Sequence, residues 1–377
     1  MLDPIIDWFR QAVTGLWHAF YGLVKWLLAP FTGFYRFFMN AGAILKIVLG
    51  VLLVPFFFFY GWFVWDAAFI RNYDTDWPSK FSFENRTSSA GEQVAVEGGT
   101  QDTRTCGRSG IVEAVNHLVA FNVNDNAWIS SHPLYKAGFF GIEWDATPFM
   151  DNKANFQRGV HQASTRIGVE LADQLGRVRG TSEIDRDLQA ARGAMQFDNY
   201  TWFFNPFSNQ PFGPTTRSQT YYRDAMRSFA RYNDRLERCQ ATFDARADNL
   251  MAVLDRIAKD IGSTSASIKD RAESNNSGWF DTRADNQFYF AKGQLYAQYG
   301  ILRAARADFQ DVIELRQIGD LWTNMESQMR SAIELDPFIV SNGREDGWIM
   351  PSHLTTIGFY ILRVRANLVE VRSVLDR

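Results

Sequence analysis

Residues Ile47–Trp65, IVLGVLLVPFFFFYGWFVW, form an uncharged apolar stretch bracketed by Lys46 and Asp66. A bilayer-crossing helix needs roughly 20 predominantly apolar residues, so this stretch has the length and composition of one membrane span. It starts too late in the chain, and is too long, to be the apolar region of a cleaved signal peptide. We therefore expect a single transmembrane helix within residues 43–68.

Basic residues flank this span unequally, and short loops rich in Lys and Arg stay in the cytoplasm. The basic residues before the span are Arg10, Lys25, Arg36 and Lys46. Those that follow it, Arg71, Lys80 and Arg86, are interspersed with acidic residues. The bias predicts a cytoplasmic N-terminus and a C-terminal domain on the outer side of the membrane.

The arm before the span, residues 1–42, repeats apolar residues every three or four positions, which indicates one apolar helical stripe. Its aromatic members include Trp8, Trp17, Phe20, Trp26 and Phe31. We expect an amphipathic helix at the membrane interface that is ended or kinked at Pro30. The competing interpretation is a second span over Val13–Ala29, which would return the large domain to the cytoplasm; Lys25 and His18 in that window argue against it.

The overall composition indicates a folded body, with 46% hydrophobic and 21% charged residues and a net charge of -3. No basic patch is interleaved with aromatic residues, so the sequence gives no indication of nucleic-acid binding. Cys106 and Cys239 have no metal-type spacing. A disulfide between them, if the domain is periplasmic, and two buried free thiols remain as alternatives.

After the span, residues 69–104 are interpreted as a linker, because Arg86–Thr105 is rich in Ser, Gly, Thr and Gln. Residues 105–377 are expected to form an all-α domain. Helical patterns cover Thr105–Asn122, Asn152–Arg179 and Ser182–Met195, and Asn205–Pro214 then breaks the chain.

The clearest periodic signal in this domain is an apolar residue at every seventh position. The series is Tyr222, Phe229, Leu236, Phe243, Leu250 and Ile257. It predicts a helix over Thr216–Lys269, ~80 Å long, that pairs with a second helix over Ala284–Leu335 in an antiparallel, coiled-coil-like hairpin. The fold expected is therefore a membrane-anchored, elongated helical bundle. Polar Asn233 and Gln240 lie in the seam, where such residues fix register or oligomeric state.

A weak internal repeat places a tryptophan after Asp, Asn or Gly in connections between helices, at Trp128, Trp348 and, more loosely, Trp279. The first two tryptophans are followed by Ser-His pairs that contain His132 and His353. We interpret these segments as helix-capping turns with packed indoles at one end of the bundle. The alternative is a ligand or partner surface made of these tryptophans and histidines.

The candidate catalytic residues are better explained structurally. The histidines form no HxxxH or HExxH pair, so no metal site or cofactor is predicted. Glu143 and Asp145 flank Trp144 as a glycan-cleaving pair would, but Asp145 or Thr147 is expected to cap a helix opened by Pro148. Ser130 and Ser131 precede His132 without a GxSxG elbow. We predict no catalytic residue.

Two motifs, FNVNDNAW at Phe121–Trp128 and GWIMPSH at Gly347–His353, occur downstream of the aromatic arm and the span. In this order they resemble an uncharacterised family of bacterial inner-membrane proteins, a domain of unknown function. The resemblance implies a Gram-negative cell envelope, and hence an inner-membrane anchor and a periplasmic domain. It carries no substrate or catalytic residue.

Two functions from different classes follow from these patterns. The first is a structural or scaffolding protein that contacts membrane lipid, self-associates through the seam, joins other envelope proteins and shapes the membrane through its arm. The second is a cell-envelope enzyme or binding protein that acts on glycan or lipid through the tryptophan loops. The first is favoured because no reactive site is visible.

Overall fold

The computed structural model describes residues 3–83, 89–91, 94–95, 104–139, 142–147, 149–177, 183–202 and 215–377. The chain divides into two compact units, Met1–Trp62 and Phe63–Arg377. The predicted break at Asn205–Pro214 and most of the predicted linker stretch Arg86–Thr105 lie outside the described residues.

The first unit consists of α1, Asp3–Asn40, and most of α2, Ala43–Ala68. Among the described residues, α2 is the one helix long and apolar enough to cross a membrane, and it contains the predicted span. Helix α1 continues past Pro30, so this residue does not end it. The aromatic stripe of α1 is exposed at Trp17, Phe20, Trp26 and Phe31, while the side chain of Trp8 lies outside the described part.

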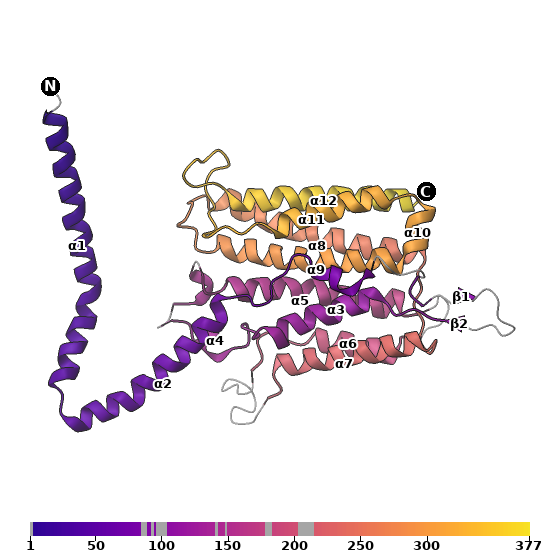
Figure 1. Cartoon of the computed structure of the whole chain (residues 1–377), viewed down its shortest axis with the longest axis horizontal. Coiled ribbons are helices and arrows are strands. Elements are labelled where there is room, and N and C mark those ends of the chain that lie inside the picture. The colour runs from indigo at the N-terminus through magenta and orange to yellow at the C-terminus, as the bar shows by residue number, and fades with distance from the viewer. Residues whose placement is uncertain are drawn as a thin grey trace. The chain divides into compact units, whose positions relative to one another are not determined.

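The second unit is all-α, as predicted, apart from one two-residue strand pair (Figure 1). Its helices are α3 (Gly110–Ala120), α4 (Pro133–Ala137), α5 (Asn152–Glu170), α6 (Arg186–Met195), α7 (Ser218–Glu237), α8 (Ala247–Ser274), α9 (Ala284–Asp308), α10 (Gln310–Leu315), α11 (Gly319–Ile333) and α12 (His353–Leu375). Shorter segments are the 3-10 turns η1 (Trp77–Phe81) and η4 (Trp144–Ala146), the π turns η3 (Phe121–Asp125) and η5 (Leu171–Leu175), and the antiparallel strands β1 (Val94–Ala95) and β2 (Arg104–Thr105).

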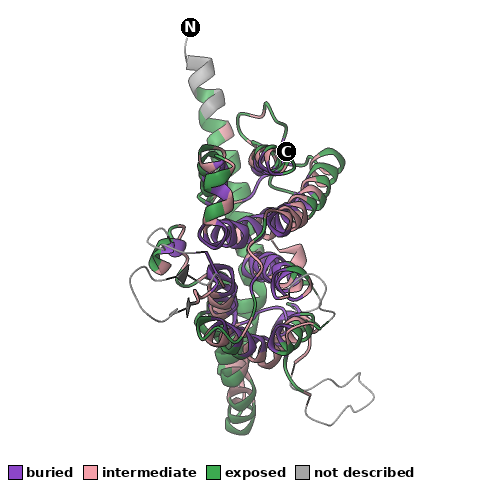
Figure 2. Cartoon of the chain, turned by 90° about the vertical axis from the view of Figure 1, so that its right-hand side faces the viewer, coloured by how far each residue is buried: buried purple, intermediate pink, exposed green. Residues whose placement is uncertain are grey.

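The helices of this domain lie side by side in stacked layers, with α11 and α12 at one edge and α6 and α7 at the other (Figure 1). Helix α9 lies between them and is buried along most of its length, and Figure 2 shows buried residues on the inner sides of the packed helices and exposed ones on the outside. It crosses α5 at two glycines, because a Cβ at Gly293 would lie 2.0 Å from the Phe156 carbonyl oxygen and one at Gly159 2.1 Å from that of Phe290. Only residues without a side chain allow this approach.

The predicted long hairpin is wrong. The seven-residue series is divided between α7 and α8, which are separated by a non-helical connection around Cys239, whose φ of 58° is left-handed. The second expected helix is likewise divided into α9, α10 and α11. All members of the series are nevertheless buried, including Phe243 in the connection, because each faces the core of the same chain.

The polar seam residue Asn233 acts within the chain. Its side chain accepts a hydrogen bond from the Ser109 backbone N–H (2.8 Å) and donates one to the Ser109 carbonyl oxygen (3.1 Å). Buried Asp308 accepts hydrogen bonds from the N–H groups of Gly110 and Ile111, where an acidic group complements the helix N-terminus. Asn233 thus fixes α7 against the start of α3, and Gln240 lies exposed in the connection.

Cys106 and Cys239 form a disulfide, which resolves the alternative left open by the sequence. The bond joins the segment before α3 to the end of α7. The predicted linker also contributes to the core, since Trp77 of η1 is buried and stacks on His117 with ring centroids 4.7 Å apart.

Candidate functional site

The last turn of α2, which belongs to the second unit, is packed into the domain. Phe63 and Ala67 are both fully buried. The Phe63 ring lies 5.0 Å from the His132 ring and 5.4 Å from the Trp144 ring, measured between centroids. The exit of α2 therefore has a built apolar socket in the domain.

Hydrogen bonds also hold the last turn of α2 and the residues that follow it. Asn126 accepts from the Arg71 backbone N–H (2.9 Å) and donates to the carbonyl oxygens of Arg71 (3.1 Å) and Phe121 (3.0 Å). Lys153, which is buried, donates from Nζ to the Asp66 carbonyl oxygen (2.7 Å). Burial lowers the pKa of Lys153 to about 8. We call Asn126, Lys153 and the Phe63 socket the α2 clamp.

All three tryptophan loops lie at the end of the domain that holds this clamp (Figure 1). Trp128 is buried and donates from Nε1 to the Asn199 carbonyl oxygen (2.8 Å). Trp279 and Trp348 are 47% and 95% exposed. The packed-indole interpretation therefore holds for Trp128, whereas the other two indoles are presented to the surroundings.

Each of the two histidines of the repeat accepts a hydrogen bond from a backbone N–H. Nδ1 of His132 accepts from the Leu134 backbone N–H (3.2 Å) at the start of α4, and Nδ1 of His353 accepts from that of Ser341 (2.9 Å). Burial lowers the pKa of both imidazoles, which keeps them neutral and able to accept. His132 is thus not free to act as a base toward Ser131.

The carboxylates that flank Trp144 do not form a catalytic pair. Asp145 accepts a hydrogen bond from the Tyr135 hydroxyl and lies 3.7 Å from Arg158 Nη2, whereas Glu143 is exposed. The prediction that Asp145 or Thr147 caps the next helix is also wrong, because α5 begins at Asn152 with Asp151 in the N-cap position. Thr147 instead donates to the Trp144 carbonyl oxygen, and Pro148 lies outside the described residues.

Sequence analysis missed a buried pair of carboxyl groups, Asp151 and Asp285, at the starts of α5 and α9. Burial raises the pKa of each, and the negative charge of Asp285 raises that of Asp151 further. Two buried carboxyl groups this close do not both ionise readily, so we expect one of them to keep its proton near neutral pH. A shared Asp-Asn dipeptide at the two helix starts, Asp151-Asn152 and Asp285-Asn286, is the one sequence signal for this pair.

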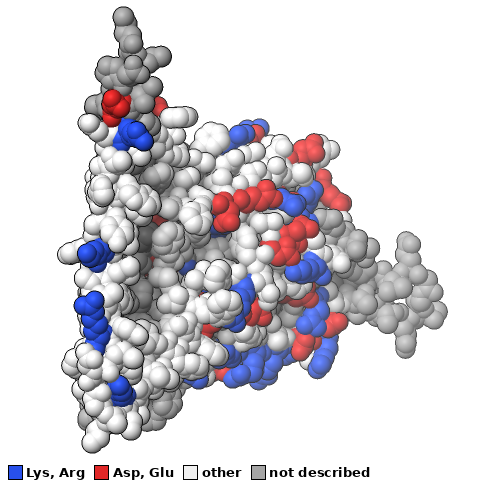
Figure 3. Space-filling model, turned by 60° about the vertical axis from the view of Figure 1, so that its left-hand side comes forward, with Lys and Arg blue, Asp and Glu red and all other residues white. Residues whose placement is uncertain are grey.

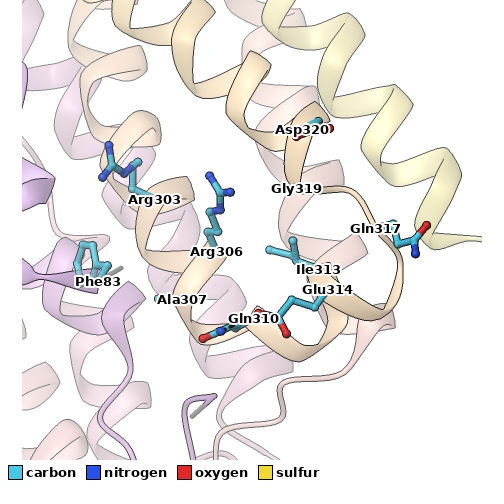
Figure 4. A pocket seen from close by; sticks show the side chains of 10 residues that line it. All are labelled: Phe83, Arg303, Arg306, Ala307, Gln310, Ile313, Glu314, Gln317, Gly319 and Asp320. Atoms are coloured by element: carbon cyan, nitrogen blue, oxygen red, sulfur yellow. Dashed lines mark hydrogen bonds between the residues drawn. The ribbon is translucent and has the colours of Figure 1, made fainter. Parts of the chain in front are cut away.

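At the opposite end of the domain, α9, α10 and the start of α11 surround an open pocket of about 460 Å³ (Figure 4). Its arginines have partners in the chain: Arg303 donates to the Tyr299 hydroxyl (3.3 Å), and Arg306 lies 3.5 Å from Glu326 and donates to Thr323 (3.1 Å). The described part of the chain holds no cluster of His, Cys, Asp or Glu suited to a metal ion. The described lining of the pocket therefore gives no indication of a particular ligand or reaction.

The sequence pattern of one bacterial family, described as "Uncharacterized protein conserved in bacteria (DUF2333)", matches residues 122–277 and 268–377. The chain belongs to this family. No significant match was found to a curated protein or to a solved structure.

The family match begins at Asn122, one residue into the FNVNDNAW motif, and so includes the receiving side of the clamp, Asn126, His132, Trp144 and Lys153. Helix α2 and Arg71 precede the match. The part of the chain that defines the family thus contains the groups that bind the end of α2.

Proposed function

We propose that this protein is a single-pass component of the bacterial inner membrane with a structural role, in which a periplasmic helical domain is fixed to the end of its own membrane span. The α2 clamp carries the proposal. A domain tethered only by its chain needs no buried lysine and no paired asparagine at the junction, since burying such polar groups costs free energy unless each is bonded. Catalysis is not part of the proposal.

The disulfide supports the periplasmic side. Disulfides persist in oxidising compartments and are rare in the cytosol. Cys106 and Cys239 are the only cysteines of the chain and they pair with each other. The excess of basic residues before the span favours the same orientation.

Topology is tested with reporters fused after Arg377. Alkaline phosphatase folds only outside the cytoplasm, whereas green fluorescent protein exported in the unfolded state does not fluoresce. We expect an active phosphatase fusion and a dark fluorescent fusion. The reverse result would place the domain in the cytoplasm and overturn this part of the proposal.

The second part of the proposal is self-association. The seven-residue seam does not support it, because the residues of the seam are buried within one chain. It rests on the exposed aromatic stripe of α1, whose side chains need a lipid or protein neighbour. Light scattering of the full chain in mild detergent gives its mass. A discrete multimer is expected, and a clean monomer would remove self-association.

The arm provides a test of membrane shaping and of assembly. Deleting residues 1–40 while keeping α2 should leave membrane insertion intact, because α2 alone has the length of a span. We expect the truncated chain to lose the multimer or the effect on vesicle curvature. Unchanged assembly and unchanged vesicles would exclude a role of the arm in either.

A binding protein for envelope lipid or glycan remains the second candidate, because Trp279 and Trp348 are exposed on ordered loops. An enzyme that uses Glu143 and Asp145 as its acid pair is not supported, since Asp145 accepts a hydrogen bond from the Tyr135 hydroxyl and Glu143 is exposed. Unchanged binding of envelope lipid and glycan after replacing both tryptophans would exclude this candidate.

A further inference from the structure

Large aromatic side chains point outward at the clamp end of the domain. We call them the aromatic rim: Phe139, Phe149, Trp279, Phe280, Phe338 and Trp348. Phe338 is 91% exposed, Trp348 95% and Phe280 79%. Scattered single hydrophobic residues are normal on a protein surface, but a group of aromatic residues at one end indicates a binding surface.

The loops that carry the rim are held in place by buried polar contacts. Gly278 and Asn342 exchange two backbone hydrogen bonds (3.0 and 3.2 Å). The Asn342 side chain, fully buried, donates to Asp281 (2.8 Å) and to the Asn275 carbonyl oxygen (2.6 Å). The exposure of Trp279 and Trp348 is therefore imposed by a fixed scaffold.

One member of the rim, Phe139, adjoins the place where α2 enters the domain. The Trp144 ring, which contacts Phe63, lies 5.9 Å from the Phe139 ring. A second pair of the rim brings two loops together, since the Phe149 ring lies 6.4 Å from that of Phe338. At the end of α2, Trp65 and Phe69 are exposed with ring centroids 5.3 Å apart, an arrangement typical of residues at the membrane-water interface.

We propose that the aromatic rim inserts into the headgroup layer of the membrane that α2 crosses, so that the domain rests on the bilayer surface. Covalent continuity of α2 brings that surface to the clamp end. Transfer of tryptophan and phenylalanine rings from water to the membrane interface is favourable, and the indole N–H keeps a polar partner there. The occupant of this surface is thus lipid.

Site-specific fluorescence in proteoliposomes tests the proposal on the full chain. Both native cysteines are in the disulfide, so one introduced cysteine gives one labelling site. An environment-sensitive dye is attached in Phe338→Cys or Trp348→Cys, with phosphatidylcholine that carries a nitroxide near the headgroup as the quencher. The matched control is Leu315→Cys, 81% exposed in α10 at the opposite end of the domain (Figure 1).

We expect the nitroxide lipid to quench the dye at 338 and 348 at least about threefold more than at 315, with blue-shifted emission at both rim sites. Equal quenching at all three sites would overturn the proposal. Blue-shifted emission without lipid quenching would do so too, because it would mean that a second copy or another protein covers the rim.

The inference depends on α2 spanning a membrane and not on which side the domain lies. A topology test that places the domain in the cytoplasm would therefore not contradict insertion of the rim. Conversely, if the rim sites were quenched no more than position 315, the insertion would be excluded and the proposed orientation would be unaffected.

Discussion

The buried carboxyl groups of Asp151 and Asp285 are expected to make the stability of the domain depend on pH. Asp151 is fully buried and Asp285 is 3% exposed. Burial raises the pKa of both carboxyl groups well above the ordinary value of an aspartate. The folded chain thus binds protons that the unfolded chain has released, since an unfolded aspartate titrates near pH 4.

We predict that replacing Asp285 by Asn flattens this dependence. Because the pKa values of the folded chain lie above the unfolded value, the contribution to stability is full below about pH 4 and is lost as the pH rises through the raised pKa values of the pair. The melting temperature of the wild type should therefore fall between pH 5 and pH 9, and that of Asp285→Asn should fall less. Asp346→Asn, an exposed carboxylate, is the control; parallel curves for all three proteins would contradict the prediction.

A second residue-scale prediction concerns the crossing of α5 and α9. Gly293→Ala should lower the free energy of unfolding by about 2–4 kcal/mol, because its Cβ would overlap the Phe156 carbonyl oxygen and the helices must separate. Gly193→Ala in α6, with no atom within 4 Å of the new Cβ, should instead raise it by about 0.5–1 kcal/mol. Urea denaturation followed by circular dichroism compares the two; equal effects would mean that the crossing is not close.

At the scale of elements, sequence periodicity predicted burial correctly and connectivity incorrectly. The spacing of Tyr222, Phe229 and Leu236 belongs to α7, and that of Leu250 and Ile257 to α8, but Phe243 reaches the core from a non-helical turn. Periodicity records which residues face apolar surroundings and contains no information on whether those surroundings belong to the same chain. The positive φ of Cys239, imposed by the turn, has no local signature such as glycine or proline.

The disulfide joins two elements whose connection is long, and its removal should be costly. Replacing both Cys106 and Cys239 by Ser should lower the free energy of unfolding by about 2–4 kcal/mol, because the reduced chain has more freedom when unfolded. Reductant should lower the melting temperature of the wild type and leave that of the double variant unchanged. A wild type insensitive to reductant under unfolding conditions would show that the bond does not form in the cell.

At the scale of the whole molecule, charge and apolar surface are distributed differently along the chain. Acidic and basic side chains are interspersed over the helical domain, whereas charges are few and isolated in the N-terminal part of the chain (Figure 3). Composition alone predicted this division between a sparsely charged apolar part and a highly charged helical part. The clamp could not be predicted, because Asn126 and Lys153 bind backbone groups 55 and 87 residues away in sequence.

The clamp leads to a prediction about how the span and the domain are joined. Asn126→Ala removes the three hydrogen bonds from this side chain to Arg71 and Phe121. Their loss, at about 1.5–3 kcal/mol in total, should raise the population of the open state about tenfold or more. Amide hydrogen exchange of the full chain in detergent should accelerate over residues 63–72 and stay unchanged in α12.

The matched control is Asn124→Ala, two residues earlier in the same motif, whose exposed side chain accepts one hydrogen bond from Arg223. It should leave exchange over residues 63–72 at the wild-type rate. If both variants exchange alike there, the end of α2 is held by apolar packing of Phe63 and Ala67 alone. A faster rate for Asn126→Ala alone would mean that the hydrogen bonds of this side chain hold the end of α2 in the domain.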